Sequence, residues 1–154
     1  MSDFNKYFFE DLLATESLDS GKTIGEIINE KTNGQLLVNG QATYELAETC
    51  KHDFEIMKKC CIAELEKMKI TGIIAAPYYF ERAAILARKE RNYAFEVDII
   101  ETYINEIAIF YKAKSILVGE GVMAGPKYNA IQKRLLKAKK LLSKENGGLS
   151  RNVD

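Results

Sequence analysis

The side chains best suited to catalysis are those of His52, the one histidine in the sequence, and of Cys50, two residues before it. A cysteine nucleophile needs a base within hydrogen-bond reach, and residues two apart on a helix point in different directions. The remaining cysteines, Cys60 and Cys61, are adjacent, and an odd total makes a poor disulfide framework. No zinc-ligand spacing is present either. We therefore expect reduced thiols, no metal, no cofactor and no enzymatic activity.

A glycine-containing stretch at residues 119–127 invites comparison with a phosphate-binding loop. That loop requires a glycine, four residues, and then Gly-Lys-Ser/Thr between a strand and a helix. In this sequence Pro126 separates Gly125 from Lys127, neither Ser nor Thr follows, and the preceding pattern is helical. The stretch is therefore predicted to be a plain connection, which can still act as a movable loop at a binding surface.

Basic residues near the C-terminus are the clearest surface feature of the sequence. Residues 127–144 contain seven basic side chains and no acidic one. Lys133, Lys137, Lys140 and Lys144 recur at helical spacing and share one face, with Arg134 beside them. Such a face can bind phosphates in a salt-dependent way or an acidic protein, or it can simply solvate the helix. Aromatic residues are not interleaved with the lysines, which disfavours binding of single strands.

Charge is unevenly distributed although the formal net charge is zero. Residues 1–76 hold 13 acidic against 8 basic side chains, and residues 77–154 hold 9 against 14. This asymmetry can steer a charged partner, or both halves can merely solvate their helices. Tyr78, Tyr79 and Arg82 are further candidates for a partner surface because such residues often anchor interfaces. They are equally common in the core and rim of a helix pair.

The elements that must position these residues are predicted to be helices. Residues 4–14 repeat aromatic and leucine side chains at helical spacing, and Thr23 with Glu26 fits the capping box of a short helix ending near Lys31. Residues 35–40 suit a loop or a short extended segment. An apolar stripe then predicts one continuous helix over residues 42–68. Its members are Ala47, Cys50, Phe54, Met57, Cys61, Leu65 and Met68.

Three further elements complete the predicted fold. Pro77 suits the first turn of a helix that continues to Lys89. A second helix is predicted from Tyr93 to about Tyr111, with an apolar inner face. A last helix is predicted from Lys127 to Ser143, followed by the pair Gly147-Gly148 and a frayed end.

The helix–turn–helix at about residues 77–108 resembles a tetratricopeptide repeat. In that family an aromatic residue opens the first helix, small residues lie at the crossing, and a polar turn and a tyrosine precede the second helix. The matching positions are Phe80, Ala83, Ala84, Ala87, Asn92, Tyr93, Val97 and Ile104. Glu96 departs from the pattern because the family usually has alanine there. The resemblance implies a scaffold that binds peptides or proteins, with residues 133–142 similar to a closing helix of such arrays.

These observations predict an all-α fold, either a helical bundle or a short tetratricopeptide-like stack of about five helices. Residues 1–146 are predicted to form one domain and residues 147–154 a flexible tail. No secretory signal or membrane-spanning run is expected, so we place the chain in the cytoplasm. The predicted function is non-enzymatic binding of a protein partner, with association between copies of the chain left open. The alternatives are a nucleic-acid-associated protein that uses the basic helix, and a small phage or mobile-element inhibitor of a larger complex.

Overall fold

Helix α2 (Ile24–Lys31) starts at the predicted capping box. The computed structural model describes residues 18–114 and 121–151, so the helix predicted at residues 4–14 lies outside the described part. The backbone N–H of Glu26 donates to Thr23 Oγ1 at 3.1 Å, and the N–H of Thr23 donates to the Glu26 carboxylate at 3.2 Å. The two side chains thus satisfy amide groups that have no partner within the first turn.

The predicted extended segment near residues 35–40 is reduced to one bridge around a two-residue turn. Val38 and Gln41 exchange both backbone hydrogen bonds, at 2.8 and 3.0 Å. Between them Asn39 and Gly40 have φ angles of 50° and 78°, the conformation that Asn-Gly adopts most readily in a hairpin turn. The polypeptide then enters α3 instead of continuing as a strand, so this region is a loop.

The single helix predicted over residues 42–68 is wrong, because the structure has two helices there. Helix α3 covers Thr43–Thr49 and α4 covers Phe54–Thr71. Asp53 caps α4 by accepting a hydrogen bond from the backbone N–H of Ile56 at 3.1 Å. Two side chains of α5 (Pro77–Lys89), the helix after α4, bind backbone carbonyl groups that the break leaves without a partner in a helix. Tyr78 donates to the carbonyl of Ala47, and Arg82 donates to that of Lys51. The break is therefore stabilised by residues about 30 positions further along the chain.

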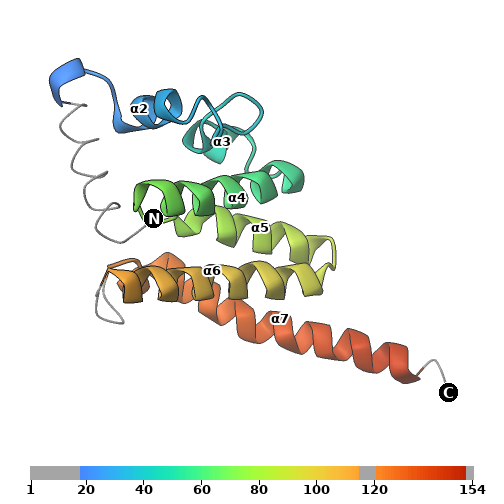
Figure 1. The fold of residues 1–154 in the computed structure, drawn as a ribbon. Helices are drawn as coiled ribbons and strands as arrows, with labels where there is room; N and C mark the ends of the chain where they lie inside the picture. Colours follow the sequence, from blue (N-terminus) through green and yellow to red (C-terminus); the bar gives the residue numbers. More distant parts are fainter. Residues whose placement is uncertain (1–17, 115–120, 152–154) are drawn as a thin grey trace.

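Four helices pack side by side in chain order (Figure 1). Helix α4 contacts α5 (Pro77–Lys89), α5 contacts α6 (Tyr93–Ala113), and α6 contacts α7 (Pro126–Arg151). Helix α5 also contacts α7, so α7 packs against two helices. The turn and start positions predicted at Pro77 and Tyr93 are confirmed. The described residues form an all-α fold without a regular strand.

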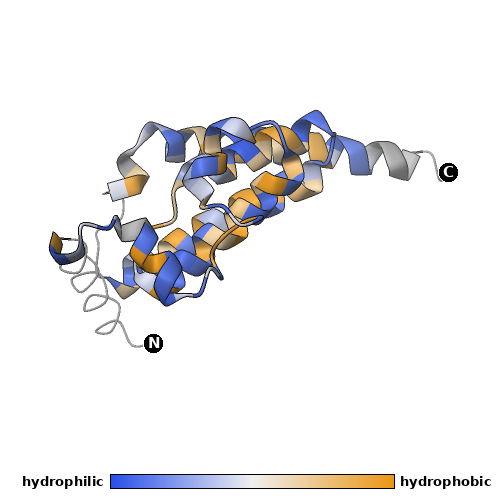
Figure 2. Cartoon of the chain, turned by 90° about the horizontal axis from the view of Figure 1, so that it is seen from above, coloured by the Kyte–Doolittle hydropathy of each residue, from blue (hydrophilic) through white to orange (hydrophobic). Residues whose placement is uncertain are grey.

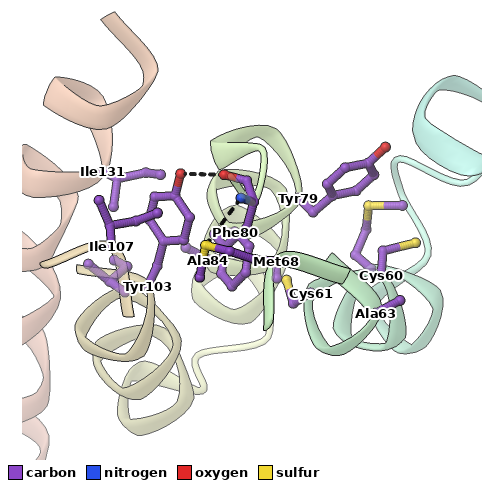
Figure 3. Close-up of a cluster of buried hydrophobic side chains, with 14 of the residues drawn as sticks. Cys60, Cys61, Ala63, Met68, Tyr79, Phe80, Ala84, Tyr103, Ile107 and Ile131 are labelled. Carbon is purple, nitrogen blue, oxygen red and sulfur yellow. Dashed lines mark hydrogen bonds between the residues drawn. The ribbon is translucent and has the colours of Figure 1, made fainter. Parts of the chain in front are cut away.

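The core lies where α4, α5, α6 and α7 meet (Figure 3). Small residues of α5, including Ala83 and Ala84, are fully buried and allow the neighbouring helices to approach closely. Phe80 and Tyr103 lie between them with ring centroids 4.3 Å apart. The Tyr103 hydroxyl donates to the carbonyl of Ala75 at 2.8 Å, which satisfies both buried groups. Figure 2 shows apolar and polar residues distributed along each of these helices, as expected for elements with one buried face.

Helix α7 is longer than predicted. A short 3-10 helix, η1 (Gly121–Ala124), precedes it, and α7 continues beyond Ser143 through Gly147 and Gly148 to Arg151. A glycine inside a helix costs only about 1 kcal/mol relative to alanine, so two near the end need not stop it. Figure 1 shows the C-terminal turns of α7 extending past the other helices.

Candidate interaction surface

Four lysines of α7 form an exposed row, which we name the lysine face: Lys133, Lys137, Lys140 and Lys144. The opposite side of α7 is buried through Tyr128, Ile131 and Ala138. The row runs from Lys133 to Lys144, which is 12 residues, or about 16 Å at the rise of an α-helix. The predicted placement of these lysines on one helix face is confirmed.

The lysines of the lysine face differ from two other lysines of α7 in that those two form ion pairs. Lys127 pairs with Glu81 at 3.3 Å, and Lys139 pairs with Glu101 at 3.1 Å. Within residues 18–114 and 121–151, no ion pair joins a lysine of the face to an acidic side chain. The face therefore presents uncompensated positive charge to the solvent.

An apolar side chain accompanies these charges. Leu136 lies three residues after Lys133 and four before Lys140, and 68% of its surface is exposed. A single exposed leucine is ordinary on a protein surface. Together with the lysine stems, which are themselves apolar, it gives this side of α7 a mixed apolar and cationic character.

Arg134, predicted to belong to the basic surface, points instead into the junction of α5, α6 and α7. Its guanidinium Nη2 lies 3.2 Å from Oε2 of Glu96, whose side chain is fully buried. Arg88 lies against the same carboxylate, with Nε at 2.9 Å from Oε1 and Nη2 at 2.9 Å from Oε2. We name these three residues the Glu96 cluster. Arg134 thus holds α7 against the bundle and is not part of the exposed row.

Burial and charge shape the Glu96 cluster. Desolvation lowers the pKa of Arg134, the adjacent Arg88 lowers it further, and the Glu96 carboxylate opposes both effects. Arg88 also donates to the backbone carbonyl of Arg134 at 3.2 Å, which adds a direct tie to α7. Glu96 is the residue that departs from the tetratricopeptide pattern. Its carboxylate compensates two arginines that an alanine at this position would leave unpaired.

Tyr78, Tyr79 and Arg82, the other predicted partner residues, bind within the chain. Tyr79 is buried with 5% of its surface exposed, and its ring contacts that of Tyr78 edge to face. The hydrogen bonds of Tyr78 and Arg82 to the α3–α4 connection use their polar groups internally. The structure therefore gives these residues a role in holding α5 against that connection. Tyr78 and Arg82 are partly buried.

The side chains considered first for chemistry lie in unlike surroundings. His52 is exposed, and its Nδ1 lies 3.3 Å from the Arg82 guanidinium, a group that cannot accept a proton. Cys60 and Cys61 are buried, whereas Cys50 is partly exposed. Burial, aided by the Glu64 charge, raises the pKa of Cys60 to about 11, and burial raises that of Cys61 further. No group of three or more potential metal ligands occurs among the described residues.

We expect a thiol reagent at neutral pH to modify one cysteine rapidly in the folded protein and all three after unfolding. Cys50 is the accessible thiol, while Cys60 and Cys61 are both shielded and held in the neutral form, which is a poor nucleophile. The number of reacting thiols is measured with an aromatic disulfide reagent, from the absorbance of the chromophore that each reaction releases. Two rapidly reacting thiols in the native state would contradict the buried placement.

The glycine-containing connection lies partly outside the described residues, because Gly119 and Glu120 belong to residues 115–120. Its described part packs on Tyr111, whose hydroxyl accepts a hydrogen bond from the backbone N–H of Met123 at 3.2 Å. A side chain at Gly121 would come within 2.7 Å of that hydroxyl, so glycine allows the close approach. Lys127, which a phosphate loop would direct at its ligand, pairs with Glu81 instead.

Comparison of the chain with protein-family models, curated proteins and solved structures finds no match. Among the described residues, no helix combines the length and the apolar character needed to cross a membrane. Inference about function therefore depends on the surfaces themselves.

Proposed function

We propose that this protein is a non-enzymatic helical interaction module that binds an acidic protein surface through the lysine face of α7. The observation that carries the proposal is that no acidic side chain of the described residues pairs with the four exposed lysines, whereas Lys127 and Lys139 of the same helix are paired. An acidic partner would supply the missing counter-charges. Because the lysines are exposed, the attraction acts mainly on association and weakens as salt rises.

Leu136 favours a protein over a nucleic acid as the partner. Phosphate backbones offer little apolar surface, whereas a protein can bury a leucine among charged contacts. The row also lacks aromatic side chains on which unpaired bases could stack. A protein with acidic side chains around a small apolar depression fits both features of the face.

The tetratricopeptide resemblance is compatible with this proposal. In our interpretation α5 and α6 form one repeat-like unit and α7 is the closing helix. Support comes from the packing of α7 on both α5 and α6 and from the polar character of its outer side. Terminal helices of repeat arrays carry such polar faces because no further repeat covers them.

The decisive experiment reverses the charge of the face and of a matched set of lysines elsewhere. The face variant carries Lys133→Glu, Lys137→Glu and Lys140→Glu. Its control carries the same change at exposed Lys59, Lys69 and Lys89, so both proteins have equal net charge. If each reversal on the face costs about 1 kcal/mol at low salt, affinity for the partner falls about 100-fold in the face variant and little in the control.

Affinity capture at low and high salt, with mass spectrometry, measures this difference for all three proteins. We expect one acidic protein to be retained by the wild type and the control, and to be lost at high salt and from the face variant. Equal capture by the face variant and the control would contradict the proposal. Loss of all capture after nuclease treatment would identify nucleic acid as the ligand and would contradict it too.

A further inference from the structure

A half-enclosed pocket of about 330 Å³ lies between α2, α3 and α4, on the far side of α4 from the lysine face. Its apolar wall comes from Ile28, Leu36, Ala63 and Ile73. Ile28 and Leu36 belong to a small second core that is separate from the main one. In Figure 1, α2 and α3 lie above α4, away from α6 and α7. The volume is at the small end of the range for ligand sites.

Two charged side chains of α4 lie in the pocket wall. Glu64 is almost fully buried, with 2% of its side chain exposed, and Lys67 is 28% exposed. The Lys67 ammonium lies 3.2 Å from the Glu64 carboxylate, so the pair carries no net charge. Thr43 donates to Glu64 Oε1 at 2.6 Å, and the backbone N–H of Ala76 donates to Oε2 at 3.4 Å.

This neutral pair restricts the charge of an occupant. An anion would be attracted by the Lys67 ammonium but repelled by the buried Glu64 carboxylate, and a cation the reverse, so a charged occupant gains little net Coulomb energy from the pair. It would nevertheless lose part of its hydration in a half-enclosed space. A zwitterion would have to desolvate two full charges. A neutral molecule avoids these costs while its apolar part fills the space lined by the isoleucines.

We propose that this pocket binds a neutral, largely apolar small molecule that carries a single hydroxyl or amide group. The apolar body lies against Ile28, Leu36 and Ile73. The polar group hydrogen-bonds to the Glu64–Lys67 pair or to the side chain of Asn29, which also lines the pocket. Tyr44, an aromatic residue with 65% of its surface exposed, stands in the wall and covers part of the ligand. This site is independent of the lysine face.

Three small aromatic probes, which share a para-ethyl-substituted ring and differ in charge, test the proposal on the whole chain. They are para-ethylphenol, which is neutral, para-ethylbenzoate, an anion, and para-ethylbenzylamine, a cation. Methyl resonances of labelled isoleucine, leucine and alanine report binding by NMR titration. We expect saturable shifts at Ile28, Leu36, Ala63 and Ile73 with the phenol, at an affinity about tenfold higher than for either charged probe.

Two neighbouring substitutions on α4 provide the structural control. Ala63→Leu places extra volume in the pocket and should abolish the shifts. Ile62→Leu alters the adjacent exposed residue, which does not line the pocket, and should leave them unchanged. If Ala63→Leu does not fold, Ala42→Leu, at another residue that lines the pocket, serves the same purpose. No saturable shift with any probe, equal binding of a charged probe, or unchanged binding in the folded filled variant would overturn the proposal.

Discussion

Replacing Glu96 with alanine should lower the free energy of unfolding by about 3 kcal/mol. The carboxylate is fully buried and is the charge partner of Arg88 and Arg134, which are 26% and 22% exposed. Removing one member of a buried ion pair leaves the opposite charge without compensation, at a cost of about 3–5 kcal/mol. The partial exposure of both arginines gives them some solvent, which places the effect at the lower end. Urea unfolding followed by circular dichroism measures it.

The matched control is Glu101→Ala on the same helix. Glu101 pairs with Lys139, and both side chains are about half exposed, so its loss should cost no more than about 0.5 kcal/mol. A second comparison uses the background Arg88→Met with Arg134→Met, in which Glu96→Ala should cost much less because no arginine remains to be orphaned. Equal effects of Glu96→Ala in both backgrounds would show that the cluster contributes through packing and not through charge.

Replacing Phe80 with alanine should lower the free energy of unfolding by about 4 kcal/mol. Phe80 has no exposed surface and packs against the Tyr103 ring at the centre of the four helices, as Figure 3 shows. Truncation removes a large apolar side chain and leaves a cavity that closely packed helices fill only in part. The loss is a large share of the roughly 5–15 kcal/mol that stabilises a typical domain. Thermal and urea unfolding both measure it.

Two further substitutions serve as comparisons for the stability of the Phe80→Ala protein. Phe80→Leu keeps most of the volume and should cost less than half as much as alanine. Ile109→Ala on α6 removes an apolar side chain that is 63% exposed, and its effect should stay within about 0.5 kcal/mol. A Phe80→Ala protein as stable as the Ile109→Ala protein would mean that α5 and α6 do not pack as described.

Helix α7 carries two groups of basic side chains: Arg134, which faces the other helices, and the lysine face, which faces the solvent. Arg134 pairs with Glu96 in the Glu96 cluster and so holds α7 against α5 and α6. The lysine face, one residue away at its start, is free of acidic partners in the described part of the chain. A long helix that packs on α5 and α6 along its buried side and is polar on its outer side can present its charges in a fixed row. This arrangement supports the proposed binding of an acidic surface.

Local patterns in the sequence were sufficient to predict several elements. The capping box at Thr23 and Glu26, the helix starts at Pro77 and Tyr93, and the common face of Lys133 to Lys144 each depend on residues within a few turns of one another. Neighbouring side chains and backbone conformation decide such features. The all-α class follows from the same helical periodicity, which repeats along most of the chain.

Only the tertiary structure decided where this periodicity is interrupted and which charges are buried. The apolar stripe passes through residues 50–53 without a change, yet Tyr78 and Arg82 bind carbonyl groups of α3 and of the following turn and stabilise a break there. Arg134 and Lys133 are adjacent basic residues, but in the part of the chain that the structure describes only Arg134 pairs with a carboxylate, that of Glu96 on α6, some 40 positions earlier. The pocket beside Glu64 likewise arises from segments that meet in space. Helical spacing defines which side chains share a face, whereas the partner of that face depends on contacts between distant segments.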